Sequence, residues 1–186
     1  MHKKIALLLA ACSLVAASVI GQQGNQPNIG RTPSADEIKQ WDITVLPNGT
    51  GLPAGSGTPE QGEALYKAKC ASCHGENGEG KPPVGVVLVG GIGTLATEKP
   101  VKTIGSYWPY ATSVWDYIYR SMPYTEPGTL SAGETYAVTA FLLFKNSIIK
   151  HDEAMNKDTL PEVRMPNRDG FIPDSRPDVG VSPKSR

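Results

Sequence analysis

Cys70-Ala71-Ser72-Cys73-His74 is the stretch of sequence that decides the fold. Two thiols separated by two residues, with a histidine directly after the second, are typical of the attachment site of a c-type haem. The spacing suits this chemistry, because each thiol adds across one vinyl group of the porphyrin and the next residue is carried beneath the ring. We therefore predict one covalently bound haem c, with Cys70 and Cys73 as the thioether residues and His74 as an axial ligand of the iron.

Two other kinds of site use the same residue types. A redox-active Cys-x-x-Cys pair is expected near a βαβ pattern, and no alternation of strands and helices flanks residues 70–74. A zinc site needs a second pair of Cys or His ligands at matched spacing. Outside the motif the chain contains only Cys12, His2 and His151. Haem attachment is therefore favoured over dithiol chemistry and over zinc binding.

Length and charge limit the remaining function classes. The 186 residues accommodate one domain with extensions. Lys and Arg together number 18, as do Asp and Glu, so the formal net charge is zero. No run of basic residues is long enough for a nucleic-acid patch. We expect no nucleic-acid partner, and only weak electrostatic steering of protein partners.

Residues 1–21 have the pattern of an export signal. Lys3 and Lys4 precede an apolar run that is short for a membrane span. Cleavage after Gly21 fits a small-residue site, and the segment ending at Cys12 also resembles a lipoprotein cleavage box. The alternatives are a cleaved signal peptide, lipidation at Cys12, or retention as an uncleaved anchor. Each of them predicts export to the periplasm.

Residues 22–57 are rich in Gly, Pro and small polar residues, which predicts an extended N-terminal arm. A capping box over residues 34–37 predicts one or two turns of helix within it. The apolar side chains are sparse. We expect order in this arm where Trp41, Ile43 and Leu46 cover a surface.

Residues 58–149 are predicted to form the folded domain. A capping box at residues 58–61, with proline at its second position, predicts the start of the first helix. This helix leads into the Cys-x-x-Cys-His motif. A further box predicts a short helix over 113–120, and another opens a strongly apolar helix over 131–149. The last helix is too short and too amphipathic to cross a membrane.

The second axial ligand is predicted to be Met122, on a loop just past the short helix. A ligand there can return across the opposite face of the porphyrin, and Met/His ligation raises the reduction potential of cytochromes c. The other candidates for this ligand are Met155, Met165 and His151, all of which lie beyond the last clearly predicted helix. If none of these residues binds iron, the sixth position is open.

A glycine-rich stretch, 75–93, follows the motif. It is not a phosphate-binding loop, because the required lysine followed by Ser or Thr is missing. Glycine here lets the backbone pass close to the porphyrin edge. We expect the carbonyl of Pro82 or Pro83 to accept a hydrogen bond from His74 Nδ1–H, which would orient the imidazole.

Residues 150–186 contain five prolines and little periodicity. Such a stretch cannot bury enough apolar surface to fold by itself. This C-terminal tail therefore either wraps around the domain or docks on another protein.

The pattern of residues 58–149 resembles a class I cytochrome c. The resemblance rests on a first helix with Gly62 and Tyr66, the haem motif, a distal Met-Pro pair and a last helix with Val138 and Phe141. It implies an all-α fold of about four helices around one haem. In that family the two terminal helices cross, with the small residue and the aromatic rings at the contact.

A narrower resemblance lies mostly outside this pattern. Four stretches are similar to the cytochrome subunit of bacterial sulfur (sulfane) dehydrogenase, SoxD: Trp41-Asp42-Ile43, Gly-Leu-Pro-Ala-Gly-Ser-Gly at 51–57, Val-Lys-Thr-Ile-Gly-Ser-Tyr-Trp-Pro-Tyr at 101–110, and Met-Pro-Asn-Arg-Asp-Gly-Phe at 165–171. The better-known members carry a second haem domain, whereas this chain has one Cys-x-x-Cys-His motif.

The SoxD resemblance implies an electron-transfer subunit and not a catalytic one. The partner in that family is a molybdenum-cofactor protein of the sulfite oxidase type, which oxidises reduced sulfur and passes electrons to the haem. We therefore expect a periplasmic single-haem cytochrome that accepts electrons from a sulfane or sulfite dehydrogenase. It would pass them to a downstream cytochrome or oxidase. The alternatives are a general electron-transfer cytochrome for another dehydrogenase or oxidase, and a haem protein with an open sixth position.

Overall fold

The structure is a computed structural model that describes residues 30–172, 174 and 176. The expected signal peptide or anchor at residues 1–21 lies outside the described residues. The chain divides into two compact units, residues 1–42 and residues 43–186. No helix of the described part is long and apolar enough to cross a membrane.

The described part of the first unit contains one helix, α2 (Ala35–Trp41). Its capping box is formed as predicted, since Ser34 Oγ accepts from the Glu37 backbone N–H and the Glu37 carboxylate accepts from the Ser34 N–H. Arg31 pairs with the same carboxylate. No side chain of α2 is buried, and Trp41 is 84% exposed. Local capping therefore holds this helix, without a packed face.

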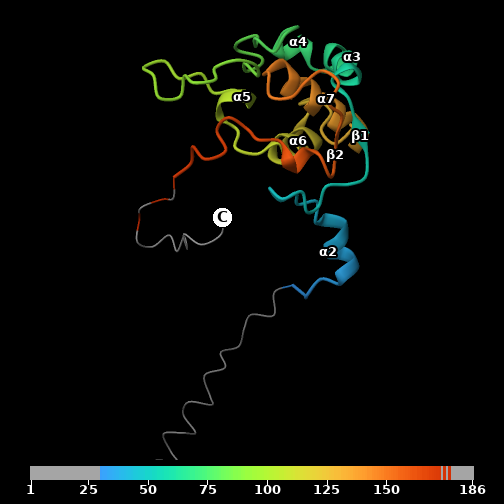
Figure 1. The fold of residues 1–186 in the computed structure, drawn as a ribbon. Coiled ribbons are helices and arrows are strands. Elements are labelled where there is room, and N and C mark those ends of the chain that lie inside the picture. Colours follow the sequence, from blue (N-terminus) through green and yellow to red (C-terminus); the bar gives the residue numbers. More distant parts are fainter. Residues whose placement is uncertain (1–29, 173, 175, 177–186) are drawn as a thin grey trace, which may run out of the picture. The chain divides into compact units, whose positions relative to one another are not determined.

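The second unit is mostly helical, which confirms the predicted all-α class (Figure 1). Its helices are α3 (Pro59–Lys69), α4 (Ala71–His74), α5 (Ile104–Tyr107), α6 (Ala111–Ser121), α7 (Ala132–Lys145) and the 3-10 helix η1 (Leu160–Glu162). Its strands are β1 (Ser56–Gly57) and β2 (Met155–Asn156), which pair antiparallel.

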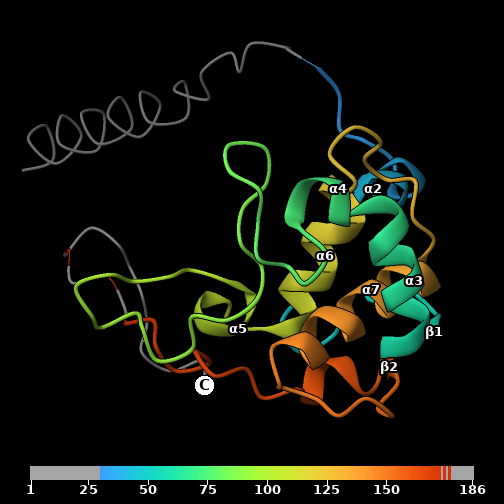
Figure 2. The same ribbon diagram turned by 90° about the horizontal axis from the view of Figure 1, so that it is seen from above.

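Helices α3 and α7 pack against each other, as Figures 1 and 2 show. A Cβ atom on Gly62 would overlap the carbonyl of Ala137, so only glycine permits this approach of the two backbones. Tyr66 and Phe141 meet at the crossing, with ring centroids 5.1 Å apart and planes at 43°. The crossing of the terminal helices is thus the one that the class I pattern implied.

Two predicted helix boundaries are wrong. Helix α6 begins at Ala111 after Tyr110, and Ser113 does not cap it. Ala111 and Thr112 are both buried, so packing extends the helix toward its N-terminus beyond the local signal. Helix α7 ends at Lys145, short of residue 149.

The tail wraps around the domain over its described residues. Strand β2 pairs with β1, and Met155, Leu160 and Met165 are 3%, 0% and 1% exposed. These three side chains belong to the same apolar core as the buried residues of α6 and α7. The tail therefore supplies part of the core that it covers.

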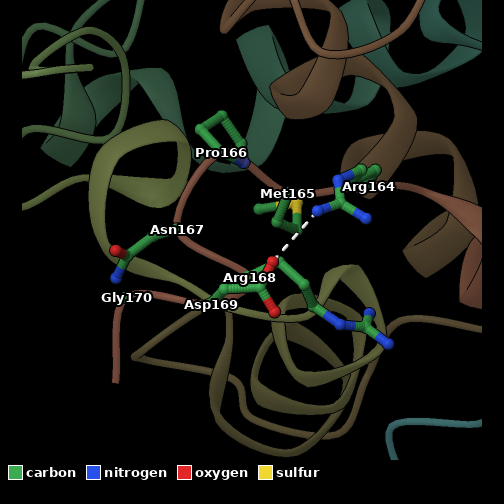
Figure 3. Close-up of a pocket in the computed structure, with 7 residues that line it drawn as sticks. All are labelled: Arg164, Met165, Pro166, Asn167, Arg168, Asp169 and Gly170. Atoms are coloured by element: carbon green, nitrogen blue, oxygen red, sulfur yellow. Dashed lines mark hydrogen bonds and ion pairs between the residues drawn. The ribbon is translucent and has the colours of Figure 1, made fainter. Parts of the chain in front are cut away.

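Residues 164–170 of the tail line a hollow (Figure 3), and no residue of the haem motif lines it. Here Asn167 Nδ2–H donates to the Tyr107 carbonyl at 2.8 Å. The guanidinium of Arg168 lies over the Tyr110 ring, 4.5 Å from its centroid. Both contacts fasten the tail to α5 and to the start of α6.

Candidate haem-binding site

One cavity of about 1020 Å³, measured with its open mouth, brings together Cys70, Cys73, His74 and Met122. It lies between the end of α3, α4, α6 and α7. Its walls are mainly apolar, with side chains from several elements: Val86, Leu88, Ile104, Val114, Ile118, Leu130, Val138 and Leu142. The sequence separates Met122 from the motif by almost fifty residues, and the fold returns it to the same space.

The end of α3 positions the motif. The Cys70 backbone N–H donates to Tyr66 as the last bond of α3, and the Cys70 carbonyl accepts from the His74 N–H at 2.9 Å, which forms the single turn of α4. Gly75 ends this turn with φ +82°, a conformation that favours glycine. The buried Tyr66 hydroxyl donates to the Gly75 carbonyl at 2.9 Å, and its burial raises the pKa of Tyr66.

The imidazole of His74 is oriented by a backbone carbonyl. Its Nδ1 lies 2.9 Å from the Val86 oxygen, so Nδ1–H donates there and Nε2 is left for a metal. The expectation that Pro82 or Pro83 supplies this carbonyl is wrong. The loop turns back at residues 81–85, where Lys81 and Gly85 form a bridge, and it therefore presents a later residue to the ring.

Two residues that the sequence did not single out hold this loop. A Cβ atom on Gly85 would overlap the Cys73 carbonyl, so the loop backbone lies directly against the motif. Asn146, at the end of α7 and only 3% exposed, accepts from the Gly90 N–H at 3.0 Å and donates to the Leu88 carbonyl at 3.2 Å. A glycine-rich stretch after a motif is a usable sequence signal, whereas a lone Asn after a helix is not.

Met122 follows the last residue of α6, partly buried at the cavity wall. Its rivals lie elsewhere in the described structure. Met155 and Met165 are packed in the core and do not line the cavity, and His151 lies edge-on against Phe144, with ring centroids 5.1 Å apart. Among the methionines that the structure describes, Met122 is the one that faces the haem motif.

The Cys70 thiol does not have the property of an attacking cysteine. Burial raises the pKa of Cys70 to about 11, whereas the attacking cysteine of a catalytic Cys-x-x-Cys pair has a lowered pKa. In the described part of the chain, no three His, Cys, Asp or Glu side chains gather as a metal site would need. The residues do fit a haem, because two free thiols and one oriented imidazole border a large apolar cavity.

Known proteins share this arrangement. Residues 57–142 match a family model described as cytochrome c oxidase, cbb3-type, subunit III. The crystal structure of the sulfane dehydrogenase SoxCD from Paracoccus pantotrophus contains a chain that is 46% identical in sequence, with a TM-score of 0.75 over 83% of this chain and 76% of that chain. No curated protein sequence matches. This chain therefore belongs to the class I cytochromes c, is similar to the cytochrome subunit of SoxCD, and carries covalently bound haem c.

Proposed function

We propose that this protein is an exported, single-haem electron-transfer subunit of a molybdenum-dependent dehydrogenase that oxidises a sulfur compound, sulfane or sulfite. It passes the electrons to a downstream cytochrome or oxidase. The observation that carries the proposal is the extent of the similarity to SoxCD. The match to the cytochrome family model is limited to residues 57–142, whereas the SoxCD match covers 83% of the chain and so extends into the flanking segments.

Four residues are assigned to the haem. Cys70 and Cys73 would hold the porphyrin through thioether bonds, and His74 and Met122 would bind the iron. Haem c supplies a one-electron couple at its iron. The Val86 carbonyl fixes the ring of His74 and increases its donor strength. A bound Met122 thioether would favour the reduced iron, and the side chains of the cavity wall beside it are mainly apolar.

The ligand assignment is tested by the absorption band that a thioether–iron bond gives in the oxidised protein. The Met122→Ala variant is expected to lose this band and to have a lower reduction potential. Met155→Leu is the matched control, because Met155 is buried away from the cavity and should leave the band unchanged. Persistence of the band in Met122→Ala would assign the ligand to another residue. Absence of the band in the unaltered protein would support an open sixth position.

The partner assignment is tested with the full holoprotein and a molybdenum protein of the sulfite oxidase type encoded beside it. The two proteins are expected to co-elute in size-exclusion chromatography. Sulfite or a sulfane compound should then reduce the haem only when the molybdenum protein is present, as followed by the ferrous absorption bands. Reduction at the same rate without it, or no reduction by either compound, would contradict the proposed role.

A further inference from the structure

We propose that Asn146 is a positioning residue for His74 and thereby lowers the reduction potential of the haem. Asn146 does not line the haem cavity. It acts through the loop that presents the Val86 carbonyl to His74 Nδ1, 2.9 Å away. The inference rests on the proposed binding of iron by His74, and it does not depend on the identity of the dehydrogenase.

The Val86 carbonyl is held by the neighbouring backbone and not by the Val86 side chain, which is 69% exposed. Before it, the backbone of Gly85 lies directly against the Cys73 carbonyl. After it, the Leu88 N–H donates to the Gly78 carbonyl at 2.7 Å. The direction of the Val86 carbonyl is therefore set by two points at which the loop is fastened, one on each side.

Asn146 fastens the second of these points. Its Oδ1 accepts from the Gly90 N–H at 3.0 Å, and its Nδ2 donates to the Leu88 carbonyl at 3.2 Å. The same Nδ2 also donates to the Leu142 carbonyl in the last turn of α7, at 2.8 Å. Asn146 is only 3% exposed, so these bonds form away from water, where they are stronger. The amide thus joins the loop to the end of α7.

Helix α5 leaves room for this amide. A Cβ atom on Gly105 would overlap the Asn146 side chain, so glycine permits the close approach of α5. The Ile104 N–H donates to the same Leu88 carbonyl at 3.2 Å. The loop is therefore bonded to both α5 and α7, and Gly105 offers a second, independent way to displace Asn146.

Helix α7 is the common support for the two halves of His74. Its crossing with α3 at Gly62 places the backbone of the motif, because α3 leads directly into Cys70. At its end, Asn146 places the carbonyl that orients the imidazole. A carbonyl out of line would bond Nδ1–H more weakly, and the imidazole would then donate less to the iron. Oxidised iron would be less stabilised, so the reduction potential would rise.

The test is the reduction potential of the holoprotein in a spectroelectrochemical titration. Asn146→Leu removes all three side-chain hydrogen bonds and is expected to raise the potential. Loss of a direct partner of a metal-bound histidine typically changes metal affinity or activity about 10–100-fold. Asn146 acts one step further away, so we expect the ratio of reduced to oxidised haem to rise up to about tenfold, which is about 59 mV for one electron. Gly105→Ala should shift the potential in the same direction.

Thr139→Val is the matched control. Thr139 is also fully buried in α7, and its hydroxyl donates to the Thr135 carbonyl at 2.7 Å, within the helix and not to the loop. Loss of this bond should lower stability and leave the potential unchanged. A second measurement is the exchange of His74 Nδ1–H for deuterium, followed by proton NMR of the reduced holoprotein. Exchange should be faster in Asn146→Leu and unchanged in Thr139→Val.

Haem ring-current shifts of the His74 ring protons in the unaltered protein first verify that His74 binds the iron, so a failure of the ligand assignment is recognised separately. An unchanged potential in Asn146→Leu would overturn the inference, and so would unchanged exchange of Nδ1–H. An equal rise of the potential in Thr139→Val would overturn it as well, because the effect would then follow from lost stability. If Asn146→Leu or Gly105→Ala fails to fold, the other variant decides by the same criteria.

Discussion

Removal of the tail is expected to destabilise the haem domain strongly, because the tail supplies core residues. A holoprotein that ends at His151 loses Met155, Leu160 and Met165, each at most 3% exposed. Full burial of such a side chain contributes about 1.5–3 kcal/mol, so the three together contribute roughly 5–9 kcal/mol. A domain of this size has about 5–15 kcal/mol of total stability. The truncation therefore removes a large part of it.

Unfolding in guanidinium chloride, followed by helical circular dichroism, measures the loss. With a slope of about 4 kcal/mol per molar denaturant, the midpoint should fall by about 1–2 M. A holoprotein that ends at Gly170 is the control, because it retains all three buried side chains and should unfold near the full-length midpoint. If the chain ending at His151 unfolds at that same midpoint, the tail is not part of the core and the reasoning is refuted.

Three further predictions follow from single contacts. Asn146→Leu should lower the free energy of unfolding by about 1–3 kcal/mol, measured in urea, because two backbone groups of the loop after the motif lose their hydrogen-bond partner. An unchanged midpoint would show that Asn146 does not stabilise this loop. Tyr66→Phe should cost a similar amount while it leaves ring packing intact, because the Gly75 carbonyl loses its donor. The Arg31 guanidinium, with the Ser34 N–H, holds the pKa of Glu37 at about 2 instead of 4.5. The Glu37 carboxylate should therefore stabilise α2 fully above about pH 4.5 and lose this effect as the pH falls through about 2. The amide chemical shifts of α2 should report this change, and in Glu37→Gln they should be insensitive to pH over the same range.

Helix starts were predictable where the signal is local. The boxes opened by Ser34, Thr58 and Ser131 each cap a helix in the structure, because the hydrogen bonds involve residues within four positions of one another. The box proposed at Ser113 failed, since burial of Ala111 and its neighbour extends α6 toward its N-terminus. That burial depends on distant residues, which a local pattern does not contain.

Short elements formed by uncommon caps were missed. The capping box of α5 pairs Thr103 with Ser106, whereas the usual capping box has Glu or Gln three residues after the N-cap. Strands β1 and β2 are two residues each and pair across almost a hundred residues. Neither shows a periodicity that a sequence window could reveal.

For the haem site, the sequence indicated the side chains better than the backbone. The motif and Met122 carry specific chemistry, and the structure places all of them around one cavity. The partner of His74 is a carbonyl, which every residue possesses, so Pro82 or Pro83 was a choice without a chemical basis. The close approach of Gly85 to the motif explains why Val86 supplies it instead.

The paired strands β1 and β2 also have a consequence for the order in which the protein is made. Synthesis proceeds from the N-terminus, so the thiols of Cys70 and Cys73 leave the ribosome long before Leu160 and Met165 can complete the core. Until those residues emerge, the nascent chain lacks part of its apolar core. The apolar core is therefore complete only after β2 and the buried side chains that follow it have been made, well after the haem motif.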